Sequence, residues 1–280
     1  MFFRRRDLSE ELRRERPIVI MARGHSGTRL SAQVLTMLGC AMGAGPEKPS
    51  WDILDQRFAR TLRALSRSNL HLPPASRPSP DDLQCFQRDV HRFMTNLGDR
   101  SLGWGWKLPE TYLLGNFVAA SFPEARLVHM VRDGRDVAFK YHRTDRPEQH
   151  LGRRTLEHLG MLGQPHHVQA AASWAFQVER FLRFSKRWPH PIHTLSFEAL
   201  LRDPEGEMEQ LAAFAGRPMT DECRRMLQGQ VNPAKIGEYR RHDPAQVAEI
   251  EARIGPTLRK VGYQVAERAT GMTRLPVLSS

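Results

Sequence analysis

One stretch of the sequence decides the fold: Pro17-Ile-Val-Ile-Met-Ala-Arg23-Gly24-His25-Ser26-Gly27-Thr28-Arg29-Leu30. Residues 18–21 form a short apolar run rich in β-branched side chains, which is typical of a buried parallel strand. The chain then passes two glycines and resumes with apolar residues at helical spacing, which predicts a helix over about 28–38. The sequence therefore predicts a strand, a glycine loop and a helix in that order.

This order of elements is suited to anion binding. The backbone N–H groups of such a loop lie at the positive end of a helix dipole and form a nest for an anion, usually a phosphate. Gly24 and Gly27 permit backbone torsions and close approaches that a Cβ would block. The side-chain donors of the loop are His25, Ser26, Thr28 and Arg29. The Gly-x4-Gly-Lys-Ser/Thr spacing of a Walker A loop is absent, so an ordinary Mg-nucleotide loop is not indicated, and a plain connection is the alternative.

Composition places the chain among folded, globular proteins. It has 280 residues, of which 40% are apolar and 26% charged. No apolar run approaches the length of a membrane span, and the segment after Met1 lacks the apolar region of a secretory signal. The three cysteines are odd in number and widely spaced, which favours reduced thiols. We therefore expect a cytoplasmic protein with no membrane span.

The charge of the chain favours anionic ligands. Its formal net charge is +11, which suits a nucleotide, a sulfate or phosphate group, a nucleic acid or an acidic surface. No basic stripe interleaved with aromatic residues is present, so we do not expect nucleic-acid binding. The histidines and cysteines lack the spacing of metal ligands, so no metal site is expected.

Strands alternate with helices along the rest of the chain. Further strands are predicted at about 103–109, 125–131 and 191–196, and this alternation argues for a parallel sheet covered by helices on both faces. Helices are predicted at about 51–65, 82–97 with Asp81 and Asp82 as caps, 110–120, 167–187 and 244–258. We expect a single domain over residues 1–280, with a helical insertion at about 45–100. A mobile loop is expected at about 143–166 and a loose tail at about 268–280.

Five segments, taken together, resemble one enzyme family. Arg23-Gly-His-Ser-Gly-Thr-Arg29 resembles the 5′-phosphosulfate loop of the sulfotransferases that use 3′-phosphoadenosine 5′-phosphosulfate (PAPS), and Leu127–Ala138 resembles their 3′-phosphate motif. Gly105–Pro109 is similar to the Lys-Thr-Pro element between those motifs. Leu195–Pro204 is similar to the family's Tyr-Glu-Asp-Leu segment, and Asn232–Arg240 with Leu258–Tyr263 to its closing region.

The resemblance implies a P-loop-like three-layer α/β fold and a sulfotransferase activity. Such an enzyme moves a sulfuryl group from PAPS to a hydroxyl or amine of a small-molecule or carbohydrate acceptor, releases adenosine 3′,5′-bisphosphate and needs no metal. Lys107 is expected to be the catalytic cation beside the sulfuryl group. The residues expected to bind PAPS are Arg23, Gly24, His25, Ser26, Gly27, Thr28, Arg29, Arg132, Lys140, Phe197, Lys235 and Arg240.

Two positions depart from the family pattern. His25 stands where the family has Lys or Arg before Ser-Gly-Thr. Protonated, or donating a neutral N–H, it is expected to contact the bridging or sulfuryl oxygen, with Arg29 supplying the fixed charge. Lys140 replaces a serine eight residues after Arg132. Eight residues are just over two helical turns, so both cations can face one phosphate.

The general base is the most open assignment. Glu47 and Asp52 follow the first strand–helix unit, where related sulfotransferases with glutamate bases place theirs, although either is also compatible with a plain surface carboxylate.

Two other functions stay open. A nucleotide-dependent kinase lacks its Walker A and Walker B signatures here, and a non-catalytic nucleotide-binding protein is favoured only by the charge and by the departures at His25 and Lys140.

Overall fold

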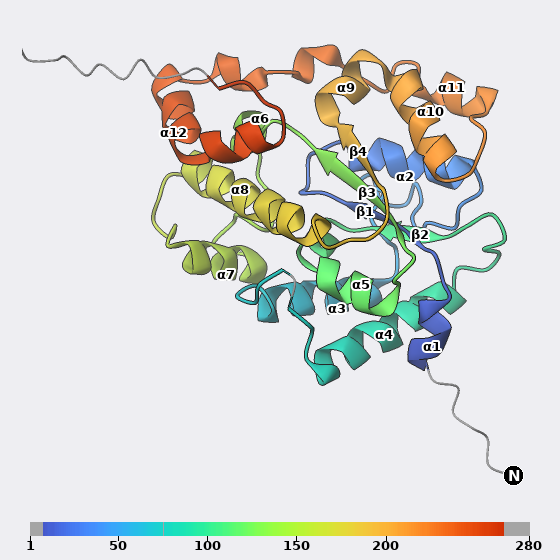
Figure 1. Ribbon diagram of the computed structural model, residues 1–280. Helices are drawn as coiled ribbons and strands as arrows, with labels where there is room; N and C mark the ends of the chain where they lie inside the picture. The colour runs from blue at the N-terminus through green and yellow to red at the C-terminus, as the bar shows by residue number, and fades with distance from the viewer. Residues whose placement is uncertain (1–7, 75, 266–280) are drawn as a thin grey trace, which may run out of the picture.

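A computed structural model of the chain describes residues 8–74 and 76–265, so the tail predicted at 268–280 lies outside the described residues. Its strands form one parallel sheet in the order β2-β1-β3-β4, with the first strand in an interior position (Figure 1). The strands are β1 (Ile18–Met21), β2 (Gly105–Lys107), β3 (Arg126–Val131) and β4 (Ile192–Ser196). The predicted parallel α/β sheet is confirmed.

Alternate residues of β1 enter two different cores. Val19 and Met21 belong to a large hydrophobic cluster on one face, whereas Ile18 and Ile20 belong to a second cluster on the other. This alternation follows from the two-residue period of a strand. Because helices close both clusters, the sheet is the middle layer of three, as the sequence predicted for this P-loop-like fold.

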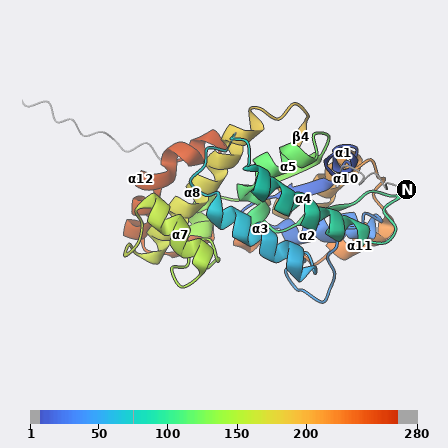
Figure 2. The ribbon, with the colours of Figure 1, turned by 90° about the horizontal axis from the view of Figure 1, so that it is seen from below.

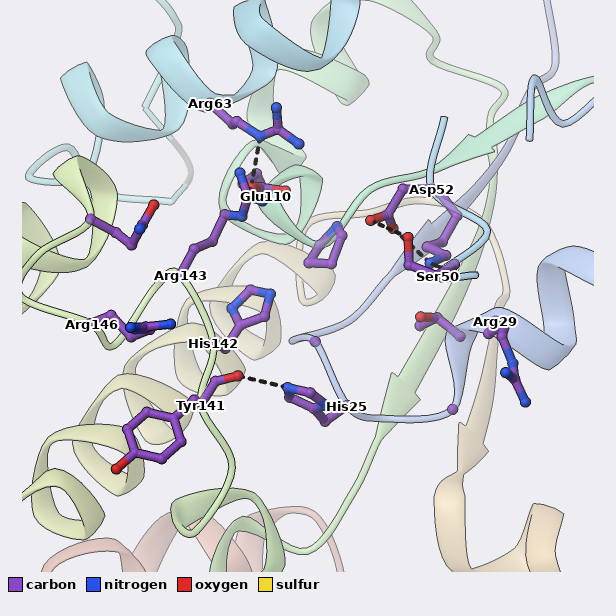
Figure 3. Close-up of a pocket in the computed structure, with 16 residues that line it drawn as sticks. His25, Arg29, Ser50, Asp52, Arg63, Glu110, Tyr141, His142, Arg143 and Arg146 are labelled. Carbon is purple, nitrogen blue, oxygen red and sulfur yellow. Dashed lines mark hydrogen bonds and ion pairs between the residues drawn. The ribbon is translucent and has the colours of Figure 1, made fainter. Parts of the chain in front are cut away.

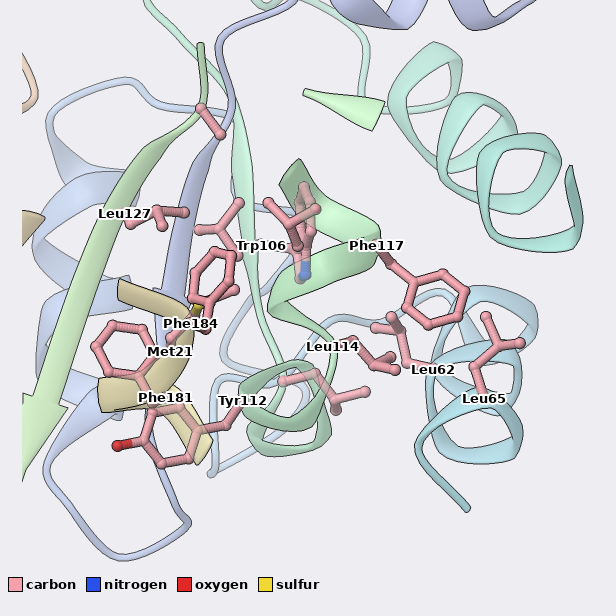
Figure 4. Close-up of a cluster of buried hydrophobic side chains, with 14 of the residues drawn as sticks. Met21, Leu62, Leu65, Trp106, Tyr112, Leu114, Phe117, Leu127, Phe181 and Phe184 are labelled. Carbon is pink, nitrogen blue, oxygen red and sulfur yellow. The ribbon is translucent and has the colours of Figure 1, made fainter. Parts of the chain in front are cut away.

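The larger cluster is closed by most of the helices. Trp106 of β2 and Phe181 of α8 pack in it with Phe117 of α5, between the sheet and the helices that cover it (Figure 4). The helices that contribute to this cluster are α1 (Leu8–Arg13), α3 (Gln56–Ser68), α4 (Pro80–Thr95), the 3-10 helix η1 (Pro109–Leu113), α5 (Gly115–Ser121), α6 (Gly134–Ala138), α8 (His166–Ser185) and α12 (Pro244–Lys260).

The second face is covered by fewer helices. These are α2 (Thr28–Met37), α9 (Phe197–Arg202), α10 (Pro204–Phe214) and α11 (Asp221–Leu227). Two short 3-10 helices, η2 (Pro233–Lys235) and η3 (Glu238–Arg241), follow α11 and lead to α12.

Residues 143–166 are not the continuous loop that the sequence predicted, because their middle forms α7 (His150–Leu159). Its apolar stripe is short, and buried Leu151 packs with Leu70, Leu113 and Phe176. Figure 2 shows α3 between α7 and α4, and α3 contacts both. So few apolar residues give little periodic signal, and contacts with the rest of the fold stabilise the helix instead.

Three other helix boundaries differ from the prediction. The helix expected from residue 51 begins at Gln56, because the Asp55 side chain accepts hydrogen bonds from the backbone N–H groups of Arg57 and Phe58 at 2.9 Å. The helix expected from residue 82 begins at Pro80 and is capped by Ser79 rather than by Asp81 or Asp82. The helix expected over 110–120 is divided into η1 and α5.

Candidate functional site

The loop between β1 and α2 leaves backbone donors available to a ligand. His25 and Gly27 have φ of 70° and 89°, in the left-handed region that glycine adopts easily. Gly27 is the N-cap of α2 and supplies no side-chain cap. The first N–H groups of a helix have no partner within the helix, and they carry its positive dipole end. The geometry is therefore that of an anion-binding nest.

A cavity of about 550 Å³ opens beside this loop (Figure 3). One wall is formed by the loop and the start of α2, and another by the end of β2 with η1. The segment between α6 and α7 supplies a third wall. The lining residues are Gly24, His25, Gly27, Thr28, Arg29, Ser50, Asp52, Arg63, Lys107, Pro109, Glu110, Tyr141, His142, Arg143, Arg146 and Gln149.

Lys107 ends β2 and carries its ammonium into this cavity. Its Nζ donates to Asp52 Oδ1 at 2.7 Å and also to the backbone carbonyl of Ser50. Burial lowers the pKa of Lys107, while the charge and hydrogen bond of Asp52 oppose that effect. Asp52 thus holds the predicted catalytic cation in place. The other predicted base, Glu47, is exposed and does not line the cavity.

The tautomer of His25 is set by a backbone carbonyl. Its Nε2 lies 2.8 Å from Tyr141 O, and a carbonyl only accepts, so Nε2 carries a proton. Burial, and then the charges of Arg23, Arg132 and Lys140, lower the pKa of His25 below its ordinary 6.5, against the raising effect of the Tyr141 carbonyl. Neutral His25 therefore has no N–H left for an anion, and its Nδ1 is an unprotonated nitrogen.

His142, which belongs to none of the predicted site motifs, also lines the cavity. Its ring occupies the place where a Cβ on Gly24 would lie, which explains why residue 24 is glycine. The Nδ1 atom accepts from Thr144 N at 3.4 Å and lies 2.9 Å from Thr144 Oγ1. No local sequence pattern identifies His142, because its role depends on the packing of the segment after α6 against the loop that contains Gly24.

A polarised chain of hydrogen bonds fixes the tautomer of His142. Gln177 Nε2 donates to the Ser173 carbonyl at 3.2 Å, which identifies it as the amide nitrogen, and it also donates to Thr144 Oγ1 at 3.1 Å. The Thr144 hydroxyl proton is then directed to His142 Nδ1. Burial keeps the pKa of His142 well below 6.5, so the neutral ring carries its proton on Nε2. His142 is thus a neutral donor, and its ring centroid lies 6.0 Å from that of His25.

Arg132 follows β3 and lies next to the loop. Its Nη1 donates to the backbone carbonyl of His25 at 3.3 Å, and its guanidinium lies 4.1 Å from the centre of the Phe197 ring. Its Nη2 donates to the Lys235 carbonyl at 3.0 Å. Within the described residues, the buried Arg132 Nε has no hydrogen-bond partner. The structure thus brings Arg132, Phe197 and the loop together.

A carboxylate lies between the two cations expected to bind one phosphate. Glu238 Oε2 accepts from Lys140 Nζ at 2.8 Å and from Arg132 Nη2 at 3.2 Å. Burial opposes ionisation of Glu238, but these two cations outweigh it and lower its pKa. Asp136, buried below, also accepts from Arg132 and receives the backbone N–H groups of Gly237 and Tyr239. The two cations expected to bind the phosphate are therefore paired with carboxylates of the protein itself.

The remaining predicted residues lie in different surroundings. Arg23 is buried, pairs with buried Asp145 and donates to the Gly24 carbonyl at 3.2 Å, outside the cavity lining. Burial and then the charge of Arg132 lower its pKa to about 9. Ser26 is buried and also outside the lining. The side chains of Lys235 and Arg240 are exposed.

The described residues contain neither a metal-binding cluster nor a membrane-spanning helix. Among residues 8–74 and 76–265, no group of three or more His, Cys, Asp or Glu side chains is placed to hold a metal ion. In the same part of the chain, no helix has both the length and the apolar character that crossing a membrane requires.

A family profile matches most of the chain, and solved structures share its fold. The profile described as "Sulfotransferase family" matches residues 17–221. The sulfotransferase domain from the curacin biosynthetic pathway is 14% identical, over 90% of this chain and 99% of its own, with a TM-score of 0.53. The sulfotransferase domain of the Synechococcus PCC 7002 olefin synthase is also 14% identical, over 90% of this chain and 97% of its own, with a TM-score of 0.52.

A third solved structure, sulfotransferase STF1 from Mycobacterium tuberculosis H37Rv, is 16% identical over 89% of this chain and 81% of its own, with a TM-score of 0.50. At these identities the three likenesses show the fold alone. The comparison with curated proteins found no match. Because the family profile covers well over half of the sequence, this chain belongs to the sulfotransferase family.

Proposed function

We propose that this protein transfers a sulfuryl group from PAPS to a hydroxyl or amine of an acceptor and releases adenosine 3′,5′-bisphosphate. The observation that carries the proposal is the hydrogen bond from Arg132 Nη1 to the His25 carbonyl. It joins two anion-binding positions at one edge of the sheet, the loop nest and the Arg132–Lys140 pair. PAPS carries an anionic group at each end of its nucleoside, and open α/β sheets bind such ligands at this edge.

The residues of the loop and β2 have distinct roles in this proposal. The first N–H groups of α2, with Thr28 and Arg29, bind the phosphosulfate. Lys107 stabilises the negative charge that grows on the phosphate oxygen as the sulfur–oxygen bond breaks. The Nε2–H of His142 donates to an oxygen of the transferring group. Asp52 orients Lys107 through their 2.7 Å contact.

The acceptor must lose a proton as its oxygen or nitrogen bonds to sulfur. His25 is the base favoured by the geometry, because its N–H is committed to Tyr141 and its Nδ1 is unprotonated. Asp52 is the alternative, although its Oδ1 already accepts from Lys107 and its Oδ2 from Ser50 at 2.9 Å. Both carboxylate oxygens of Asp52 are therefore already engaged in hydrogen bonds.

The Arg132–Lys140 position fits a phosphate but must first release Glu238. Arg132 Nε is buried and has no hydrogen-bond partner among the described residues. A phosphate oxygen that accepts from Nε would therefore not break an existing hydrogen bond. Arg forms parallel bonds to phosphate oxygens. The 3′-phosphate is therefore proposed to take the place of the Glu238 carboxylate, with Phe197 beside it.

We also propose that the enzyme acts in the cytoplasm. Cys40, Cys85 and Cys223 are free thiols, as is usual in a reducing compartment.

The experiment that tests the proposed function is incubation of the purified protein with PAPS labelled with ³⁵S and a mixture of hydroxyl and amine acceptors, with and without Mg²⁺. We expect labelled products whose formation is the same in EDTA. Transfer of label from [γ-³²P]ATP that requires Mg²⁺, without transfer from PAPS, would instead identify a kinase. Tight nucleotide binding with no transfer to any acceptor would identify a binding protein.

A further inference from the structure

Two arginines of the cavity wall are held by one buried carboxylate. Glu110 of η1 is 1% exposed, and its Oε1 lies 3.1 Å from Arg63 Nε and 3.4 Å from Arg143 Nε. Arg63 comes from α3 and Arg143 from the segment that follows α6. A single oxygen thus brings together guanidinium groups from two distant parts of the chain.

The cluster of Arg63, Arg143 and Glu110 presents a net positive charge to the cavity. Two guanidinium groups face one carboxylate, and in the described part of the chain neither arginine forms a further hydrogen bond through its Nη atoms. Arg63 and Arg143 are 28% and 44% exposed, and both line the cavity. Their Nη groups are therefore free to bind an anion, and guanidinium groups suit the planar, paired oxygens of carboxylates and phosphates.

The cluster lies away from the loop where the phosphosulfate is proposed to bind. Figure 3 shows Arg63, Glu110 and Arg143 together on the opposite side of the cavity from Arg29. Lys107 is close enough to both regions that the charge of Glu110 raises its pKa and that of Arg29 lowers it. With the sulfuryl group beside Lys107, as proposed above, the Arg63–Arg143 side of the cavity is left to the acceptor.

We propose that the acceptor is an anion, whose carboxylate, phosphate or sulfate group binds Arg63 and Arg143 while its hydroxyl or amine is directed toward Lys107. This inference rests on the proposed function and names its substrate class. Buried Glu110 is the residue that positions the two arginines.

The test compares matched acid and neutral ligands. The probes are 4-hydroxybenzoate against its methyl ester and mannose 6-phosphate against mannose, so that the two pairs separate a carboxylate from a phosphate. Binding is measured by calorimetry with the enzyme saturated with adenosine 3′,5′-bisphosphate, and again without nucleotide. We expect at least one acid to bind about tenfold or more tightly than its neutral partner, since bonds to charged groups contribute about 1.5–3 kcal/mol.

Substitutions of the two arginines test whether the preference for the acid over the neutral ligand arises from this cluster. Arg63→Gln and Arg143→Gln are expected to lower the preference for the acid about tenfold and to leave the affinity for adenosine 3′,5′-bisphosphate unchanged. Arg143→Lys retains the charge and is expected to retain part of the preference. Arg67→Gln is the matched control, because Arg67 is exposed on the same helix, one turn from Arg63 and outside the cavity lining.

Equal binding of acid and neutral ligand in both pairs, including no detectable binding of either, would overturn the inference. So would a preference that survives both Arg63→Gln and Arg143→Gln. Failure of the wild-type protein to bind adenosine 3′,5′-bisphosphate contradicts the proposed function instead. The titrations without nucleotide then still report whether the cluster binds acids.

Discussion

Lys140 donates a hydrogen bond of 2.8 Å to the carboxylate of Glu238. The same oxygen accepts from Arg132 at 3.2 Å, so the two cations proposed to bind the 3′-phosphate already share an anion of the protein. A phosphate that binds there must displace this carboxylate. The free energy of binding a 3′-phosphate here is then a difference. It is the free energy of the charged hydrogen bonds that the phosphate gains, less that of the bonds that Glu238 loses.

Glu238→Gln removes this competition and is expected to bind adenosine 3′,5′-bisphosphate about tenfold more tightly, because a charge-assisted hydrogen bond contributes about 1.5–3 kcal/mol. Adenosine 5′-monophosphate, which lacks the 3′-phosphate, should bind with unchanged affinity. Calorimetry with both nucleotides measures this, with Glu222→Gln as a control for an exposed glutamate on α11. Weaker binding of the bisphosphate by Glu238→Gln would show that the carboxylate supports the site.

His25→Gln tests the proposed base. The pKa of His25 lies below 6.5, so its Nδ1 is unprotonated at neutral pH, and turnover should fall only as the pH drops through that lowered pKa. His25→Gln is expected to reduce kcat by about a hundredfold or more and to remove this acidic limb. His25→Lys, which restores the usual cation of the family, should not rescue activity. Full activity of His25→Lys with no pH dependence would instead make residue 25 a cation at the leaving group.

Lys107→Ala is expected to lower kcat about a hundred- to a thousandfold, the usual cost of losing one donor to a developing oxyanion. The affinity for adenosine 3′,5′-bisphosphate should change little, because the proposed role belongs to the transition state. Single-turnover rates and calorimetry separate the two effects, and Lys48→Ala serves as a control, because Lys48 is a nearby lysine outside the cavity lining. A loss of nucleotide affinity that matches the loss of rate would assign Lys107 to binding alone.

Sequence patterns sufficed for the parts of the fold that have local signals. The run at 18–21 and the glycines of the loop predict the strand, the turn and the start of α2, and each is found in the structure. The helix at 150–159 is not predicted, because few of its residues are apolar and the packing partners of Leu151 are distant in the sequence. The starts of α3 and α4 also differ from the prediction, because the side chains of Asp55 and Ser79 cap these helices.

The site could be predicted only where it follows a motif. Lys107 ends β2 and Arg132 follows β3, and these two parallel strands flank β1, so the topology alone brings both residues to the same edge of the sheet. His142, Glu110 and Glu238 have no such signal, because their roles depend on side chains that meet across the fold. His142 acquires its tautomer from Thr144 and from Gln177, which lies 33 residues beyond Thr144 in the chain.

A buried histidine of β3 gives a prediction about stability. Tyr112 Oη lies 2.8 Å from His129 Nε2, and burial lowers the pKa of His129 from 6.5 to about 3. Between these pH values the unfolded state binds the proton more readily, so stability is lost as the pH falls below 6.5. The slope for this group is at most about 1.4 kcal/mol per pH unit.

The double variant Tyr112→Phe and His129→Phe removes both polar partners and is expected to reduce that slope. Urea unfolding between pH 4 and 7 measures it, and Tyr112→Phe alone is the control, because it retains the histidine. An unchanged slope in the double variant would show that other groups account for the acid sensitivity.

The most direct test of the central claim is calorimetric comparison of adenosine 3′,5′-bisphosphate and adenosine 5′-monophosphate binding to the wild-type protein. The proposed PAPS site predicts that the bisphosphate binds at least about tenfold more tightly, because its extra phosphate takes the place of Glu238 at Arg132 and Lys140 and also gains Arg132 Nε, which has no partner among the described residues. Equal affinity for the two nucleotides would contradict it.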